Sequence, residues 1–419
     1  MPSAFPFTSL LDDFNRADSD SLGANWTELT DLDIVSNSVV APSTAGMAYW
    51  NPAKFLNGEV RYTINDYDVG GAFFYLPLRI ALASNRSLDP TTSGDWSGYT
   101  FRLHSSLDAQ FYSVDSGLQA IGHPISTPSR ASGDEYGVRF FQRTAEIYRK
   151  PFGGSWTFLA SRYLSGFNSE GRIGAELTAG GIIDNFAGGA YSQSDPLDYL
   201  GSHENITGPG ALDITVNTPN GASAGDTLFF SLLIASSQTG SVTPPPGATQ
   251  IGGWTVGIAD TYGAPALGVF KVEHDGVEPT YQFTATAGGT RGMTLGVSAY
   301  KGDCQVVQTV EGTDASSTTS RDSPEIDATT GNRVIAFHGG SATFNRLDWA
   351  PPFSVRADFE FYGMNGIADA PASTDLFATG TPFGSDSTQS IWRLVEIGEP
   401  APVPERQSFY MPRRRMVRR

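Results

Sequence analysis

The chain has 419 residues, with 44 acidic and 27 basic side chains, a formal charge of −17, 47 glycines and 26 prolines. This acidic balance repels nucleic-acid phosphates, no apolar run approaches the about 18 residues that span a bilayer, and the single Cys304 permits neither an internal disulfide nor a cysteine-based zinc site. A charged fraction of 17% argues against coiled coils and long solvated helices, so we expect two or three domains held together by packing.

Strand patterns dominate the first 190 residues. In Gly58–Asn65 (GEVRYTIN), the apolar residues Val60, Tyr62 and Ile64 alternate with polar ones, which predicts a strand with one buried face. Glycine-containing turn pairs separate this segment from others of the same kind. Short strands joined by regular turns indicate a sandwich or jelly roll. Further strands are predicted at residues 98–104, 110–114, 135–141, 145–149 and 156–162.

A change in composition divides the chain after residue 190. The polar stretch AYSQSDPLDYLGSHENITGPG, residues 190–210, has no alternation and is interpreted as a linker or interdomain crossover. Strand patterns then resume and fill a second region. They are predicted at residues 212–216, 227–235, 268–272, 280–285, 294–300, 333–338 and 391–397.

These patterns predict an all-β fold of two tandem antiparallel β-sandwiches, a jelly roll and a smaller sandwich, followed by an extended basic C-terminal tail. We expect the jelly roll at residues 1–190, the linker at 191–210, the second sandwich at 211–398 and the Pro/Arg-rich tail at 399–419.

The tail ends in RRRMVRR, five arginines within seven residues. Removing these five from the 27 basic residues takes the formal charge from −17 to −22. A basic tail on an acidic body is an electrostatic hook for an acidic neighbour, such as another copy of the same body. The alternative is a frayed, solvated terminus. The predicted assembly residues are Arg413, Arg414, Arg415, Arg418 and Arg419.

The N-terminal region resembles the concanavalin A-like lectin/glucanase jelly rolls of phage structural proteins. The matching pieces are LDDFNRADSDSLGANWTE (Leu11–Glu28), SGYTFRLH (Ser97–His104), SWTFLASRY (Ser155–Tyr163), GRIGAEL (Gly171–Leu177) and IIDNF (Ile182–Phe186). The resemblance covers about residues 1–190. It implies that the first and last strands pair near each other.

The second region resembles a β-sandwich module that recurs in phage and bacterial surface proteins. The usual Pro-x-Gly-Trp is interrupted here, because Ala248 follows Gly247 and the tryptophan comes later, at Trp254. Both resemblances imply virion proteins, often tail or fibre components. The matching pieces are AGDTL (Ala224–Leu228), TPPPG (Thr243–Gly247), LGVFKV (Leu267–Val272), YQFTA (Tyr281–Ala285), VSAYKG (Val297–Gly302) and IWRLVEI (Ile391–Ile397).

One segment matches the E-x-D-x-x-E signature of laminarinase-type glucanases, Glu273–Glu278 (EHDGVE). Retaining hydrolysis needs two carboxyl groups about 5–5.5 Å apart on one strand face. Here Asp275-Gly276 is a strong turn signal, and Pro279, which disfavours a central strand, follows at once. We therefore interpret the segment as a polar hairpin tip.

Other catalytic and metal-binding signals are absent from the sequence. There is no G-x-S-x-G, no P-loop, no G-x-G-x-x-G leading into a helix, and no histidine pair at ligand spacing. Asp12, Asp13 and Asp184 lie on segments expected to approach each other, which raises the question of a calcium site. We favour the alternative that these acids cap turns or pair with Arg16. No metal or cofactor is expected, and the chain is predicted not to be an enzyme.

A carbohydrate site is predicted in the first sandwich. Sugar binding needs an aromatic plate for the apolar face of the sugar, with fixed polar groups beside it. The segment TTSGDWSGY offers Asp95, Trp96 and Tyr99, and Tyr112 lies on a later strand that could be nearby. The alternative is that Trp96 packs into the rim of the sandwich.

These observations predict a bacteriophage virion protein of the tail, such as a minor tail, tail-tip or fibre component. It would scaffold the particle and bind host-surface carbohydrate weakly at each of many copies. Expected partners are other virion proteins, further copies of the same chain and a host-surface glycan, with no nucleic acid and no membrane. The start, MPSAFPFTSLLDDF, shows no secretory signal, which fits assembly in the host cytoplasm.

Three other functions stay open at this point. A capsid decoration or head-fibre protein would use the same modules on the shell of the particle. A glycan-degrading hydrolase (depolymerase) would need carboxylates that converge from distant strands. A bacterial surface adhesin would need a secretory signal.

Overall fold

The computed structural model describes most of the chain. No helix in this part is long and apolar enough to cross a membrane. The described residues are 5–6, 8–30, 32–42, 45–66, 72–78, 98–103, 108–113, 119–127, 130–141, 143–164, 170–191, 197, 199–235, 242–257, 264–286, 292–314, 321–340, 347–361, 363–373, 376, 378–382 and 390–399.

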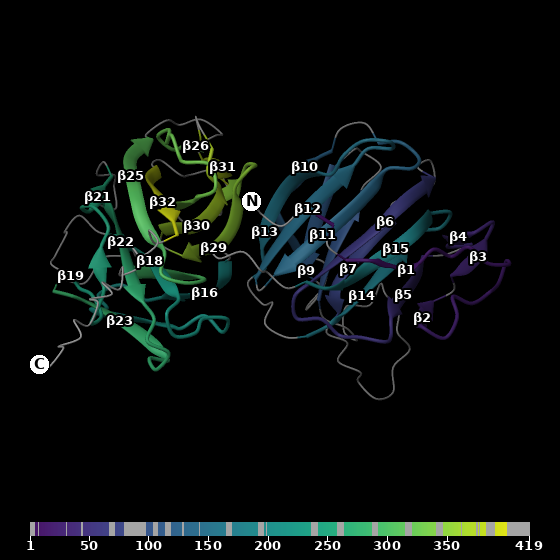
Figure 1. Ribbon diagram of the computed structural model, residues 1–419, viewed down its shortest axis with the longest axis horizontal. Helices are drawn as coiled ribbons and strands as arrows, with labels where there is room; N and C mark the ends of the chain where they lie inside the picture. The colour runs from purple at the N-terminus through teal and green to yellow at the C-terminus, as the bar shows by residue number, and fades with distance from the viewer. Residues whose placement is uncertain are drawn as a thin grey trace, which may run out of the picture.

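The first body is a sandwich of two antiparallel sheets (Figure 1). In β6 the inward-facing Val60, Tyr62 and Ile64 are at most 3% exposed, which confirms the alternation predicted there. Sheet 1 runs β13 (Thr157–Tyr163), β12 (Thr144–Lys150), β11 (Glu135–Phe141), β6 (Gly58–Asp66), β15 (Ile182–Ala190), β4 (Ser38–Val40) and β3 (Asp33–Val35), with β1 (Leu10–Asp12) paired to β15. Sheet 2 runs β10 (Gln119–Ser126), β9 (Asp108–Ser113), β8 (Tyr99–Leu103), β7 (Ala72–Leu78), β14 (Arg172–Leu177), β5 (Gly46–Trp50) and β2 (Trp26–Thr30).

The pairing of β1 with β15 joins the first and last strands of this body, as the resemblance implied. Leu10 lies opposite Ala187, and Asp12 lies opposite Phe186. Aromatic rings from both ends of the segment meet in the core, where the rings of Trp26 and Phe186 are 4.8 Å apart. The chain therefore closes the first sandwich on itself before it enters the second body.

The second body contains four sheets, all paired antiparallel in the part of the chain that is described. Sheet 3 runs β16 (Tyr199–Ile206), β24 (Met293–Tyr300), β18 (Thr227–Ala235), β22 (Pro265–Glu273) and β20 (Thr249–Gln250), with β21 (Thr255–Val256) also paired to β22. Sheet 4 runs β25 (Gln305–Asp314), β32 (Ser390–Gly398), β27 (Arg333–Gly340), β30 (Gly363–Pro371) and β29 (Ser354–Phe361). Sheet 5 runs β17 (Asp213–Asn217), β23 (Thr280–Ala285) and β19 (Val242–Thr243), and sheet 6 runs β26 (Arg321–Asp322), β31 (Thr379–Pro382) and β28 (Leu347–Trp349).

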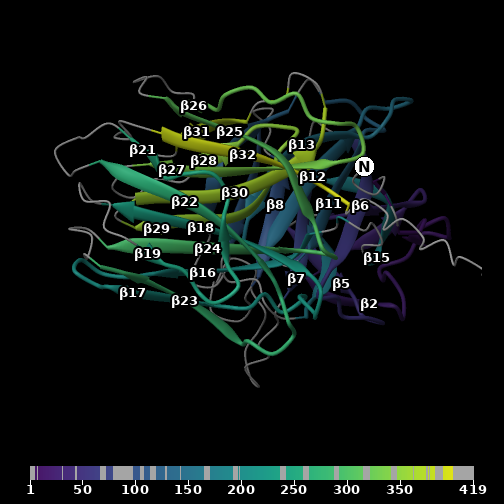
Figure 2. The ribbon, with the colours of Figure 1, turned by 60° about the vertical axis from the view of Figure 1, so that its left-hand side comes forward.

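These four sheets stack in the order 5, 3, 4, 6 (Figure 2). Successive side chains of β18 explain this order: Phe229 and Leu233 enter the core shared with sheet 4, while Phe230 and Leu232 enter the core shared with sheet 5. A strand buried on both faces reads as a continuous apolar run, as TLFFSLLIA does. The predicted all-β fold of tandem antiparallel sandwiches is confirmed. The second sandwich is not the smaller one that was expected, because a three-stranded sheet covers each of its outer faces.

The segment expected to be a linker is instead part of the second body. Residues 199–206 form β16, which pairs along its length with β24. Tyr191 and Leu197 are also buried in the core between sheets 3 and 4, where they meet Phe141 of the first body. One of the segment's polar side chains contacts the first body, since Glu204 accepts a hydrogen bond from Arg143 at 3.3 Å, whereas Asn205 and residues 208–210 are exposed.

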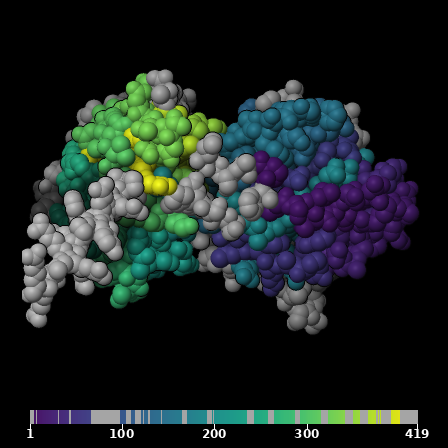
Figure 3. All heavy atoms as spheres, in the orientation of Figure 1, coloured from purple at the N-terminus to yellow at the C-terminus, as the bar shows by residue number. Residues whose placement is uncertain are grey.

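The two bodies lie side by side (Figure 3) and are joined by direct hydrogen bonds. The Thr144 hydroxyl donates to the carbonyl of Val355 at 2.6 Å, and the Val355 amide donates to the Ser161 hydroxyl at 2.8 Å. Strands β12 and β13 of sheet 1 thus dock on β29 of sheet 4.

A buried row of alternating charges crosses the same boundary, and we call it the ion chain. Arg139 lies 2.7 Å from Glu59 and 3.8 Å from Glu146, all in the first body. Arg356 of the second body lies 3.4 Å from Glu146 and 2.8 Å from Asp369. Arg333 lies 3.1 Å from Asp369. The ion chain comprises Glu59, Arg139, Glu146, Arg356, Asp369 and Arg333, three acids and three bases, each less than 9% exposed.

Arginines hold Glu146 and Asp369 of the ion chain in their charged form. Burial by itself raises the pKa of Glu146, but Arg356 and Arg139 outweigh it and keep this pKa below its ordinary value. Burial likewise opposes the charge of Asp369, whose pKa Arg356 and Arg333 lower. A lowered folded-state pKa gives stability that is present above the ordinary carboxylate pKa and is lost as pH falls through the lowered one.

Replacing Arg356 by Met should destabilise the docked arrangement strongly. It leaves Glu146 buried with only one nearby arginine, and removing one partner of a buried ion pair costs about 3–5 kcal/mol. Chemical denaturation of the full chain measures the loss. The control is Lys150→Met, which breaks a partly exposed pair with Glu135 and should change stability by less than about 1 kcal/mol. Equal effects of the two changes would contradict this account.

Candidate functional site

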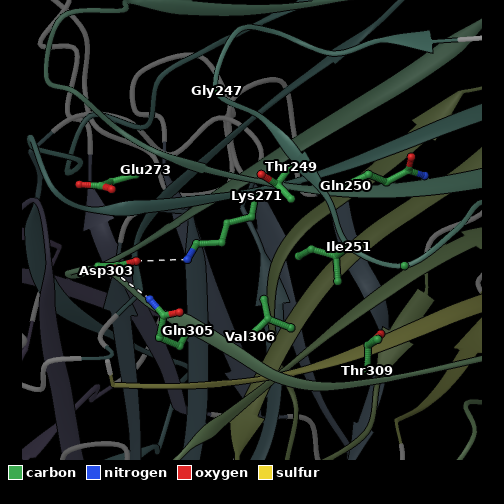
Figure 4. A pocket seen from close by; sticks show the side chains of 11 residues that line it. Gly247, Thr249, Gln250, Ile251, Lys271, Glu273, Asp303, Gln305, Val306 and Thr309 are labelled. Atoms are coloured by element: carbon green, nitrogen blue, oxygen red, sulfur yellow. Dashed lines mark hydrogen bonds and ion pairs between the residues drawn. The ribbon is translucent and has the colours of Figure 1, made fainter. Parts of the chain in front are cut away.

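A groove of about 550 Å³ opens where the edges of sheets 3 and 4 meet (Figure 4). One wall comes from β20 and β22, and the other from β25 and the turn that precedes it. Most of the lining residues lie on strands with paired backbones, so the groove is largely fixed before any ligand arrives. Polar side chains that line it include Thr249, Gln250, Lys271, Glu273, Gln305 and Thr309.

The floor of the groove is apolar and its rim is polar. Ile251 belongs to the core between sheets 3 and 4, and Val306 packs against that core. Within the described part of the chain, the rim side chains of Thr249, Gln250 and Thr309 make no hydrogen bond. Free hydroxyl and amide groups around an apolar floor match a ligand with one apolar face and many hydroxyl groups.

Lys271 is fixed at one end of the groove. Its ammonium lies 3.1 Å from the Asp303 carboxylate and also donates to the Cys304 carbonyl. Gln305 donates to the other oxygen of Asp303 at 2.8 Å, so the three side chains form one hydrogen-bonded row (Figure 4). The nearby Cys304 thiol is buried, and burial raises its pKa to about 11, so it stays protonated at neutral pH.

Arg393 ties the two walls together beneath the groove. This buried side chain from β32 donates to the Thr255 hydroxyl at 2.8 Å, to the Ile251 carbonyl and to Glu311 of β25. Gly252 makes room for it: a Cβ atom at this position would collide with the Arg393 guanidinium. Gly252 also has a φ of +68°, which L side chains rarely adopt.

Of the residues predicted to bind sugar, the structure describes Tyr99 and Tyr112. Tyr99 lies in the core of the first body and is 6% exposed, so its ring face is not open to a surface ligand. Tyr112 is half-buried, with the Arg102 guanidinium 5.3 Å from its ring centre. Asp95 and Trp96 lie outside the described residues. The site as a whole therefore stays a prediction, and Tyr99 is the member that the geometry disfavours because it packs inward.

The tail also lies outside the described part, which ends at Glu399. The predicted assembly role of Arg413, Arg414, Arg415, Arg418 and Arg419 therefore stays a prediction.

The acidic segment after β22 forms a turn, as expected, but it is not a hairpin tip. It connects β22 of sheet 3 to β23 of sheet 5, so the chain changes layer here. Asp275 and Glu278 are fully exposed and hydrogen-bonded to each other, which lowers the pKa of Asp275 and raises that of Glu278. Glu273 and Glu278 therefore stand on opposite sides of a turn rather than on one strand face.

The acids near the N-terminus make the contacts favoured over a calcium site. Asp12 pairs with Arg16 at 2.7 Å and accepts the Trp26 indole N–H, and Asp13 accepts the Asn15 amide. Asp184 accepts the Asn185 amide. Among the described residues no group of three or more potential ligands is placed to hold a metal ion.

No family model and no curated protein matches the chain. Several solved structures resemble part of it. They include the carbohydrate-binding module CBM66 from Bacillus subtilis (12% identity, 39% of this chain and 94% of that one, TM-score 0.29) and the exoplasmic/lumenal domain of VIP36 with bound Ca²⁺ and Man2 (12%, 44% and 88%, 0.34). A Bacillus subtilis protein of unknown function with a galectin-like fold is also similar (11%, 43% and 97%, 0.30). These similarities are too low to assign a family or a ligand to this chain.

The groove was not anticipated from the sequence. Its residues come from three separate segments, 247–252, 271–273 and 303–309, so no local motif contains them. The one signal was in β22, where Lys271 and Glu273 interrupt an otherwise apolar strand.

Replacing Gly252 by Ala should distort the groove. The left-handed conformation costs an L residue about 1–2 kcal/mol, and the new methyl group would also displace Arg393. Denaturant unfolding should show a loss of at least this size. Gly253→Ala is the matched control, because a Cβ atom there meets open space, and it should leave stability unchanged. A neutral Gly252→Ala variant would show that Arg393 does not depend on this glycine.

Proposed function

We propose that this protein is a structural component of a bacteriophage virion, a minor tail, tail-tip or fibre protein, which binds host-surface carbohydrate in the groove between β22 and β25. The observation that carries the binding proposal is the groove itself, with its apolar floor and its rim of free hydrogen-bonding side chains. The virion assignment rests on the two sequence resemblances.

The chemistry of the rim suits a neutral, polyhydroxylated ligand. Thr249 and Thr309 offer hydroxyl groups that both donate and accept, and Gln250 offers an amide that does the same. Sugar rings present apolar C–H faces, for which Ile251 and Val306 provide a surface. Because the groups stand on paired strands, little conformational entropy is lost when a ligand binds.

The carboxylates of the groove favour binding over hydrolysis. Asp303 is held by Lys271 and Gln305, so of the two carboxylates that line the groove in the described part of the chain, Glu273 alone has no side-chain partner. Hydrolysis of a glycoside needs two carboxyl groups that flank the scissile bond, one of which takes or gives a proton. We therefore propose that the protein binds glycan without cleaving it.

A scaffold role fits the rigid junction of the two bodies. The ion chain and the hydrogen bonds of β13 to β29 hold them in one orientation, so a surface on either body keeps its direction relative to the other. We propose that several copies act together, with the basic tail contacting the acidic body of a neighbour. Many weak sites on one particle then bind far more tightly than any single site.

Filling the groove should abolish carbohydrate binding. Thr309→Trp places an indole over the floor, and we expect binding to an array of bacterial surface oligosaccharides to fall at least tenfold. The control is Thr313→Trp, on the same exposed side of β25 but outside the groove, which should bind like the parent chain. Equal binding by both variants would remove the groove from the proposal.

Immunogold labelling of the phage particles that carry this gene tests the virion role. We expect gold at the tail or its tip when antibody to the purified protein is used. Gold over the head would replace the tail role by capsid decoration. Particles without gold would overturn the virion assignment.

A further inference from the structure

One aromatic side chain stands almost fully in solvent at the tip of the turn between β12 and β13. Phe152 is 79% exposed, although a phenylalanine ring is among the most strongly buried side chains in folded proteins. Single exposed apolar residues are common, so exposure alone gives Phe152 no role. Its position is informative because several buried contacts fix it.

A buried carboxylate clamps the Phe152 turn. Asp134, 1% exposed, accepts the Phe152 amide at 2.9 Å through one oxygen. Its other oxygen accepts the Ala131 amide at 3.1 Å and the Arg149 guanidinium at 2.7 Å. The Gly154 amide closes the turn on the Pro151 carbonyl at 2.7 Å. The backbone of Phe152 is thus held from two separate segments of the chain.

The ring of Phe152 rests on a glycine. A Cβ atom on Gly133 would collide with the ring, and Gly133 has a φ of +90°, so both its space and its conformation call for glycine. One side of the ring is therefore supported by backbone while the rest is open to solvent. This is the geometry of a flat apolar plate at the surface.

Polar groups lie within two residues of Phe152 and Gly133 along the chain. Lys150 and Glu135 are cross-strand partners at the ends of β12 and β11, two residues from Phe152 and Gly133 respectively, and they form an ion pair at 2.5 Å. The Ser132 hydroxyl lies next to Gly133 and donates to the Asn65 carbonyl at 2.5 Å. An aromatic plate flanked by a fixed charge pair and a hydroxyl is a combination that binds sugar rings.

We propose that the Phe152 turn is a second carbohydrate contact, on the first body, in addition to the groove on the second. The apolar face of a sugar stacks on Phe152, and its hydroxyl groups bond to Lys150 and Glu135. This inference rests on the proposed function, because it takes a surface glycan as the ligand. The ion chain holds the two bodies rigidly, so one long polysaccharide meets both contacts at a fixed separation.

Calorimetric titration of the full chain tests the second contact. The titrant is the oligosaccharide that gives the strongest signal on the array of bacterial surface glycans. The parent chain should bind two molecules, and Phe152→Ala should bind one. Phe152→Tyr should still bind two, because tyrosine also presents an aromatic ring at this position. The matched control is Val277→Ala, which removes another apolar side chain that is 77% exposed at a turn and should still bind two. Unchanged melting temperatures verify that each variant folds.

The outcomes separate this inference from the groove. Two molecules bound by Phe152→Ala would overturn the second contact and leave the groove in place. Complete loss of binding in Thr309→Trp, with Phe152 intact, would do the same. Binding lost with Phe152→Ala but kept in Thr309→Trp would support the turn and overturn the groove. A parent chain that binds no oligosaccharide on the array would overturn both.

Discussion

The ion chain is the constraint on which the arrangement of the two bodies depends. Each of its six charges loses its water on burial, and only close partners of opposite sign compensate for that loss. Glu146 belongs to the first body and Arg356 to the second, so a shift of either body would leave both charges buried and poorly paired. One relative orientation is thereby favoured strongly over its neighbours. The ring centres of Tyr191 and Tyr199 lie 4.3 and 4.5 Å from the guanidinium groups of Arg139 and Arg356, so both tyrosines pack against the ion chain.

The layers of the second body follow from the same junction. Sheet 4 meets the first body along its edge strand β29, so both of its faces stay free to be covered by sheets 3 and 6. Strands buried on both faces, such as β18 and β32, contribute side chains to two cores each. Three successive cores, between sheets 5 and 3, 3 and 4, and 4 and 6, are formed in this way. The opposite edge of sheet 4 is β25, and there the central sandwich does not close. The groove lies in that opening, and the hydrogen bonds of Arg393 join its two walls.

Much of the fold could be predicted from local patterns. Strands β11, β18 and β23 match the predicted ranges because their burial follows the sequence period or is continuous. In β16 the polar Ser202 and Glu204 hid a strand. Ser202 donates to the Arg356 carbonyl within the second body, and Glu204 accepts from Arg143 of the first body. Strand β25 was missed for another reason. Half-buried and exposed positions alternate along it without a buried face, so it lacks the apolar period that marks a core strand. The candidate sites were harder to predict from the sequence than the strands, since they combine distant segments that only the docked sheets bring together.

The surface that carries function is held by interactions well beneath it. Asp134 fixes the exposed Phe152, and Arg393 fixes the two walls of the groove, although neither buried side chain faces a ligand. A contact that is rigid before binding loses less entropy when it binds, so a weak ligand such as a single sugar gains most from this arrangement. The ion chain also fixes the two contacts relative to each other. If the bodies moved freely, the effective concentration at the second contact would be set by a flexible connection. A fixed separation raises that concentration only for polymers whose repeat matches it. Rigidity therefore favours selective binding of particular polysaccharides over nonspecific binding.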